Sequence, residues 1–119
     1  MKYFEDWEFD CKCGTCGLGI KDVSPILLDK IVLARKISNV PYSLNSAMRC
    51  PVHNEKEEGK PDSSHLIGDA IDIKTSNSYN RFRILLGLIM AGFTRIGIAR
   101  TFIHVDVDPN KDPEVSWLY

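Results

Sequence analysis

Long apolar runs are absent from this chain of 119 residues. No stretch approaches the roughly 20 consecutive apolar residues that cross a bilayer, and the segment Met1–Trp7 lacks the apolar core of a secretory signal. We therefore expect no membrane partner and a protein that is made in the cytoplasm without a signal peptide. A substrate outside the cell would then be reached only after release or delivery by another agent.

An excess of positive charge is absent as well. The formal net charge is -1 at pH 7, whereas proteins that bind nucleic acid usually carry a basic patch. Internal repeats and low-complexity segments are also missing. With 44% hydrophobic and 26% charged residues, a chain of this length can build one core but hardly two. We expect a single, monomeric domain over residues 1–119 and no nucleic-acid partner.

Apolar residues recur at helical spacing in two segments. Ser24 as N-cap and Pro25 at the first helical position predict a helix that continues to about Ser38. A second helix is predicted over residues 79–91, with Gly92 at its end. The residues expected to face the core are Leu27, Ile31, Ala34 and Ile37 in the first helix and Phe82, Leu85, Leu86, Ile89 and Met90 in the second.

Alternation of apolar and polar residues indicates strands elsewhere. Strands are predicted near 43–47 and over 69–74, followed by a β-hairpin formed by 95–99 and 102–108. Together with the helices, these elements predict an α+β fold in which two helices back a small, mostly antiparallel sheet. The remaining parts are a cysteine-containing N-terminal segment, residues 1–20, and a tail expected to be irregular, residues 109–119.

Two histidines and one aspartate are placed to meet on one face of this sheet. Asp72 lies on the polar face of its strand, because it alternates with Ile71 and Ile73, and His104 lies on the corresponding face of a hairpin strand. His65 lies in a polar stretch just before the first of these strands, so a loop must carry it over the same face. Catalytic zinc sites take three such ligands. The sequence predicts that the set binds one zinc ion, although each residue alone could be an ordinary packed or exposed one.

The pattern Ser-x-His-x-x-Gly-x-Ala-x-Asp over residues 63–72, with a later strand that carries His104, resembles a known superfamily. This is the superfamily of zinc D-alanyl-D-alanine carboxypeptidases and peptidoglycan endolysins, of phage or prophage type, which shares its fold with the hedgehog signalling domain. The likeness extends to residues 45–54, which resemble the family's Ser-x-x-Arg segment and His-Asn pair. It implies that Arg49 binds the substrate carboxylate or polarises the scissile carbonyl, and that Ser63 contacts substrate. A guanidinium also suits a carboxylate on physical grounds, and a surface ion pair is the alternative.

The chain departs from the family at the acid-base residue. Relatives usually carry that residue two or three positions before the final zinc histidine, where this chain has Phe102 and Thr101, which cannot move a proton. Asp106 lies on the same strand face as the histidine and is the candidate proton shuttle. Its alternative role is to orient the histidine or a substrate group. Asp69 and Asp108 are the next candidates for the shuttle.

Four cysteines stand outside this set. Cys11, Cys13 and Cys16 resemble a metal-binding knuckle and, with Cys50, could bind a second, structural zinc ion. The spacing C-x-C-x-x-C is less typical than paired C-x-x-C motifs, and the missing signal peptide argues against obligatory disulfides. Free thiols, a disulfide and a second zinc site all remain open. His53 could be a ligand or a substrate contact, but we expect a loop residue.

Three classes of function follow. The resemblance implies a zinc metallopeptidase that hydrolyses peptide bonds in peptidoglycan stem peptides, as a D-Ala-D-Ala carboxypeptidase or an endolysin-type endopeptidase, and this is our prediction. Water activated by zinc would attack a carbonyl held by zinc and Arg49, and Asp106 would pass the proton to the leaving amine. Access to the cell wall would need a holin, a virion or lysis. The alternatives are a hedgehog-like zinc-binding signalling module with little or no catalysis, and a cysteine-zinc interaction protein.

Overall fold

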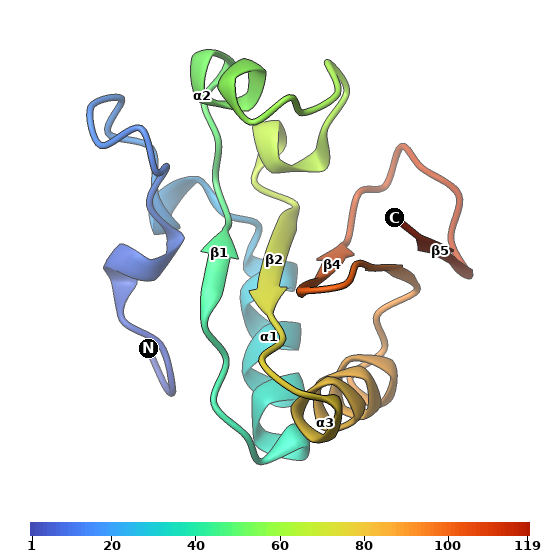
Figure 1. The fold of residues 1–119 in the computed structure, drawn as a ribbon. Helices are drawn as coiled ribbons and strands as arrows, with labels where there is room; N and C mark the ends of the chain where they lie inside the picture. The colour runs from blue at the N-terminus through green and yellow to red at the C-terminus, as the bar shows by residue number, and fades with distance from the viewer.

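Two helices lie behind a five-stranded sheet (Figure 1). The computed structural model describes residues 1–119. Its α-helices are α1 (Pro25–Ser38), α2 (Pro51–Lys56) and α3 (Ser78–Met90). Its strands are β1 (Leu44–Ser46), β2 (Ala70–Lys74), β3 (Arg95–Ile98), β4 (Phe102–Asp106) and β5 (Val115–Leu118). The predicted α+β fold, with a mostly antiparallel sheet, is confirmed.

The strands lie in the order β1-β2-β4-β3-β5. The pairs β1–β2, β2–β4 and β3–β4 are antiparallel, whereas β5 pairs parallel with β3. The prediction of an irregular tail over residues 109–119 is therefore wrong for the part of the tail that forms β5. A parallel pair joins segments that no tight turn connects, so the hairpin signals of the sequence could not indicate it.

Helix α1 begins and ends where the sequence predicts. Pro25 occupies its first position, where a missing N–H costs little, and Ser24 precedes it without making a side-chain capping bond. Asn39 ends the helix in the left-handed conformation, with φ of 54°. Of the four residues expected to face the core, the buried ones are Leu27, Ile31 and Ala34, and the half-buried one is Ile37.

Helix α3 begins and ends one residue before the predicted bounds of 79 and 91, and it buries a different face. The buried residues are Ile84, Gly87 and Leu88, and the half-buried ones include Leu85 and Leu86. Phe82, Ile89 and Met90 are each 62% exposed, so the prediction that they face inward is wrong. Gly87 explains the difference, because a Cβ at that position would collide with Ser38 of α1. The two helices approach closely along this glycine, which turns the larger side chains outward.

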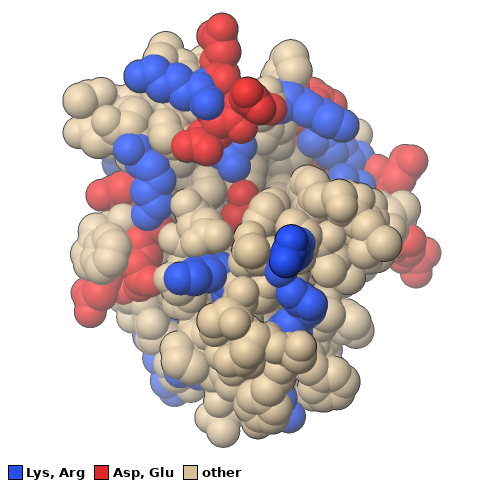
Figure 2. All heavy atoms as spheres, in the orientation of Figure 1, with Lys and Arg blue, Asp and Glu red and all other residues tan.

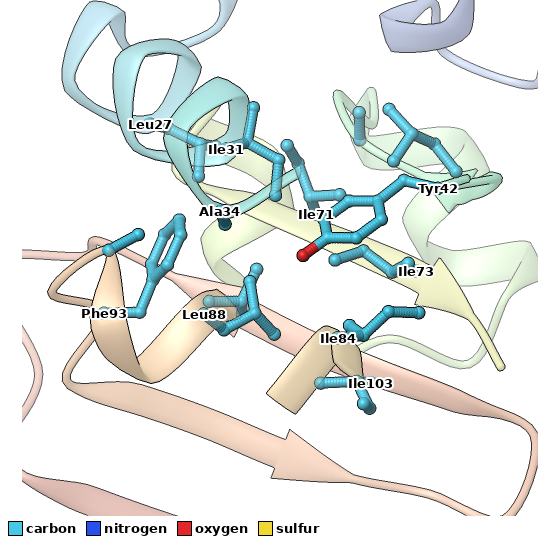
Figure 3. Packing of buried hydrophobic residues seen from close by; sticks show 14 of the residues in the cluster. Leu27, Ile31, Ala34, Tyr42, Ile71, Ile73, Ile84, Leu88, Phe93 and Ile103 are labelled. Atoms are coloured by element: carbon cyan, nitrogen blue, oxygen red, sulfur yellow. The ribbon is translucent and has the colours of Figure 1, made fainter. Parts of the chain in front are cut away.

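The core lies between the helices and one face of the sheet (Figure 3). Strand β2 contributes Ile71 and Ile73 to it, and β4 contributes Ile103 and Val105. Successive strand residues point to opposite faces of a sheet. Asp72, between the two isoleucines of β2, and His104, between Ile103 and Val105 of β4, therefore point away from the helices. None of the helices has the length and apolar character that crossing a membrane requires.

Candidate metal centre

The sheet register places two of the predicted ligands directly opposite each other. Asp72 of β2 pairs with His104 of β4 across the antiparallel ladder. The Nδ1 atom of His104 lies 2.9 Å from Oδ1 of Asp72. Both side chains are on the face away from the helices, as the alternation predicted, and both residues are buried.

The third predicted ligand is held above this pair by a short 3-10 helix, Ser64–Ile67. The Nε2 atom of His65 lies 3.3 Å from Oδ1 of Asp72. Gly68 ends the turn with φ of 74°, and a Cβ there would collide with the backbone carbonyl of Asp22. Only glycine suits this close, left-handed position, so Gly68 fixes how the turn is presented to the sheet.

The ring of His65 is oriented by a backbone group. Its Nδ1 lies 2.7 Å from the carbonyl oxygen of Ala47. A carbonyl only accepts hydrogen bonds, so Nδ1 carries a proton and donates it, which leaves Nε2 as the ring nitrogen directed toward Asp72. Ser63, predicted to contact substrate, accepts a bond from the backbone N–H of His65 at 3.3 Å and also lines the adjacent cleft. Its contact with substrate stays a prediction.

His104 lies between two carboxylates. Its Nε2 is 2.8 Å from Oδ2 of Asp106, on the ring edge opposite Asp72. Burial lowers the pKa of His104, but hydrogen bonds to Asp106 and Asp72 outweigh burial and raise it. Burial raises the pKa of Asp72, but its bonds to His104 and His65 hold it well below the ordinary value. Negative charge is thus concentrated where the two imidazoles converge.

These three residues fit a zinc ion by their donor atoms. His65, Asp72 and His104 each offer one ligand atom, and these atoms all lie within 4.8 Å of one another. Two imidazole nitrogens and one carboxylate oxygen are a donor set typical of catalytic zinc sites. The outer nitrogen of each ring donates to an oxygen, as is usual for metal-binding histidines. The predicted set is therefore brought together, with both rings in the orientation that metal binding needs.

Arg49 contacts the ligand carboxylate from its other side. Its Nη2 donates to Oδ2 of Asp72 at 3.2 Å, its Nη1 to Asn54 at 3.2 Å and its Nε to Ser46 at 3.0 Å. The side chain is only 12% exposed, so the alternative of a surface ion pair does not describe it. Arg49 lines the cleft beside the metal ligands, and its role toward substrate stays a prediction.

Asp106 has partners on both carboxylate oxygens. Oδ2 accepts from His104, while Oδ1 accepts from Nε of Arg95 at 2.8 Å and from the backbone N–H of Asp108 at 3.2 Å. Its side chain is 1% exposed. Burial raises the pKa of Asp106, but the His104 bond and the Arg95 charge hold it below its ordinary value. These contacts favour the orienting role, and the proton-shuttle role stays an untested prediction.

The other two shuttle candidates are also accounted for. Asp108 is buried and its Oδ2 accepts a bond from the Ser64 hydroxyl at 2.7 Å. Asp69 is half-buried, and burial together with the charges of Asp108 and Asp106 raises the pKa of its carboxyl. Arg95 had not been identified from the sequence. The predicted hairpin could have indicated the contact between Arg95 and Asp106, because a turn at residues 100–101 pairs position 95 with position 106.

A cleft of about 780 Å³ opens over the three ligands. Figure 2 shows this face hollowed near its middle, with an acidic group at the bottom and both basic and acidic side chains around it. One wall is aromatic and had not been predicted. The ring of Trp117 lies 5.6 Å from that of His104, and the ring of Tyr119 lies 5.2 Å from that of Phe102. Alternation of Val115, Trp117 and Tyr119, all of which line the cleft, was the available signal.

The second predicted metal set also comes together. All four thiols are free, and the four sulfur atoms lie within 4.8 Å of one another. His53 belongs to neither metal set. It lies in helix α2 rather than in the expected loop, and its Nε2 is 3.5 Å from a carboxylate oxygen of Glu57.

Comparison with known proteins agrees with the geometry of the ligand set. A search of curated proteins finds no match. The family model described as Peptidase M15 matches residues 2–108, a span that contains all three proposed zinc ligands, Arg49 and Asp106. Because this match covers most of the sequence, the chain belongs to the peptidase M15 family.

Proposed function

We propose that this protein is a zinc metallopeptidase that hydrolyses peptide bonds in the stem peptides of peptidoglycan. One observation carries the proposal: in a member of the peptidase M15 family, three metal-type donor atoms converge at the bottom of an open cleft. When bound there, zinc would supply a Lewis acid for the scissile carbonyl and lower the pKa of water to about 7. Ligands for such an ion are His65, Asp72 and His104.

The residues around the ligands would position both the metal site and the substrate. Asp106 and the Ala47 carbonyl fix the two imidazole rings, so little reorganisation is needed when the ion binds. Arg49 faces the cleft with a permanent charge and would bind a carboxylate of the substrate or polarise its carbonyl. Removing water from the cleft strengthens each of these charge interactions.

The lining of the cleft suits a short, charged peptide. Charged groups of both signs line its walls: the cations are Arg49, Lys60, Arg95 and Lys111, and the anions include Glu57, Glu58, Asp62 and Asp112. Stem peptides carry both free carboxylates and amino groups, which such a lining would attract, while Trp117 and Tyr119 offer flat apolar surface to the peptide backbone. Both a carboxypeptidase and an endopeptidase substrate agree with this lining, so the bond that is cut is left to experiment.

Mass spectrometry of purified muropeptides, before and after incubation with the zinc-loaded protein, tests the proposal. We expect a product shorter by a terminal D-alanine or by a longer stem fragment. Product formation should stop on chelation and return with added zinc. The double variant His65→Ala/His104→Ala should lose both zinc and hydrolysis. Stoichiometric zinc in the wild-type protein without any muropeptide product would instead favour the hedgehog-like binding module.

A further inference from the structure

Four cysteines from two distant parts of the chain meet away from the His-Asp site. Cys11, Cys13 and Cys16 belong to the loop after the 3-10 helix Asp6–Phe9, and Cys50 immediately precedes helix α2. In Figure 1 this loop lies on the N-terminal side of the molecule, beside the segment that joins β1 to α2. The four sulfur atoms lie within 4.8 Å of one another, and none forms a disulfide.

Backbone N–H groups point at every one of these sulfurs. Cys13 accepts from the N–H groups of Cys16 at 3.3 Å and of Thr15 at 3.4 Å. Cys16 accepts from Leu18 at 3.5 Å. The other two sulfurs have one donor each: the N–H of Cys50 lies 3.4 Å from the sulfur of Cys11, and the N–H of His53 lies 3.4 Å from that of Cys50. Hydrogen bonds to a charged acceptor are stronger than those to a neutral one, so these N–H groups would stabilise the sulfurs as metal-bound thiolates.

Two glycines make this geometry possible. Gly14 follows Cys13 with φ of 74°, and Gly17 follows Cys16 with φ of 77°. No atom lies within 4 Å of where a Cβ would be at either glycine, so lack of space does not explain them. What requires glycine is the left-handed backbone, which folds the following N–H groups back toward the preceding sulfur. The left-handed conformation of the two glycines is therefore explained by the hydrogen bonds to the sulfurs and not by core packing.

Four thiolates this close repel one another strongly unless a cation lies between them. Thiolate is the form that binds metal, and soft sulfur donors select zinc, Cu(I) or iron over hard cations such as Mg²⁺ and Ca²⁺. A set of four thiolates leaves no position for water, which is the arrangement of structural rather than catalytic zinc. No imidazole competes for the site, because His53 directs its ring to Glu57.

We propose that Cys11, Cys13, Cys16 and Cys50 bind a structural zinc ion, separate from the ion of the His-Asp site. This ion would join the N-terminal segment to the start of α2. A weaker link between the same segments exists already, as the N–H of Met48 donates to the carbonyl of Phe9 at 3.4 Å. Because Cys50 directly follows Arg49, the ion would also restrict the backbone that carries this arginine.

Metal analysis of the full-length protein tests the proposal without measuring activity. Two zinc ions per chain are expected for the wild type, and one each for Cys13→Ser/Cys16→Ser and for His65→Ala/His104→Ala. Lys12→Ser is the matched control, since it changes an exposed residue of the same loop and should keep both ions. A wild-type protein with one zinc, which the cysteine double variant retains, would overturn the proposal.

Cobalt substitution of the wild type keeps the test valid if a cysteine variant fails to fold. Cobalt bound to four thiolates gives an intense sulfur-to-metal charge-transfer absorption in the near ultraviolet, whereas nitrogen and oxygen ligands do not. The absorption should be present in the wild type and in His65→Ala/His104→Ala. Its absence from both proteins, or a disulfide between any two of the four cysteines after purification without reductant, contradicts the proposal.

Discussion

Asp72 and His104 face each other across the β2–β4 ladder, with 2.9 Å between Oδ1 and Nδ1. The register of the two strands therefore sets the distance between two proposed ligands. A slip of one residue would move one of them to the helix-covered face, where Ile71, Ile73, Ile103 and Val105 are buried. The same apolar residues that form the core thus fix the geometry of the metal centre.

The first prediction concerns Asp106. Asp106→Asn should weaken zinc binding by about 10- to 100-fold, the usual effect of removing a partner that orients a metal-binding histidine. Competition with a chromophoric chelator measures this affinity, and Asp29→Asn, an exposed change on α1, is the control. If the variant binds zinc normally but loses turnover by about 100- to 10,000-fold, Asp106 is a proton shuttle after all.

The second prediction concerns Arg49. Arg49→Lys should lower kcat/KM by roughly 10- to 100-fold, corresponding to the 1.5–3 kcal/mol typical of a hydrogen bond to a charged group. Zinc content should not change, because the three ligands stay in place. Steady-state kinetics on a muropeptide substrate gives the answer, with Arg100→Lys in the exposed hairpin turn as the matched control. Unaltered kinetics would remove Arg49 from the proposed substrate site.

The third prediction concerns the aromatic wall. A Cβ on Gly97 would lie 2.5 Å from Nε1 of Trp117, so Gly97→Ala should displace the indole and destabilise the fold by about 1–3 kcal/mol. Urea unfolding measures the loss. The double variant Gly97→Ala/Trp117→Ala should be less destabilised than the sum of the two single variants, because the clash is gone. Simple additivity would show that Gly97 has no steric relation to Trp117.

The fourth prediction concerns Tyr42, whose hydroxyl lies 2.6 Å from that of Ser38 in the core. Burial raises its pKa to about 12, despite the opposing effects of Ser38 and Arg35, whereas an unfolded tyrosine has a pKa of about 10. Between these values the unfolded state loses its proton first, so the free energy of unfolding should fall as pH rises from 10 to 12, by roughly 2–3 kcal/mol in all.

Tyr42→Phe isolates this contribution, because every other group titrates equally in both proteins. The wild type should be the more stable protein at pH 8, and its advantage should shrink or reverse by pH 12. Parallel urea denaturation curves at a series of pH values provide the comparison. A constant difference across the series would show that Tyr42 ionises as easily in the folded state as in the unfolded one.

Much of the metal centre could be predicted because it depends on a local rule. Apolar and polar residues alternate along β2 and β4 with a period of two. This period alone places Asp72 and His104 on the polar faces of their strands, without knowledge of which strands pair. The same rule gives a weaker signal for β5, because Leu118 interrupts the alternation of Val115, Trp117 and Tyr119. What the rule could not give was the parallel partner of β5, since that pairing is non-local.

The buried face of α3 and the cysteine site show the limits of such reasoning. Hydrophobicity alone predicted that Phe82 would be more deeply buried than Gly87. Close contact with α1 instead requires the smaller residue at the interface between the helices. The cysteine spacing left free thiols, a disulfide and a metal site open. Only the folded chain brings Cys50 to the N-terminal loop, and only its backbone shows which N–H groups face the sulfurs.

Strand β5 also affects how firmly the two parts of the cleft are held. It lies at the edge of the sheet and pairs only with β3, whereas Asp72 and His104 are on β2 and β4, each of which has a neighbouring strand on both sides. Edge elements open locally at a lower free-energy cost than central strands. The aromatic wall can therefore detach while the proposed zinc ligands stay together, so peptide recognition would fail under milder denaturing conditions than metal binding.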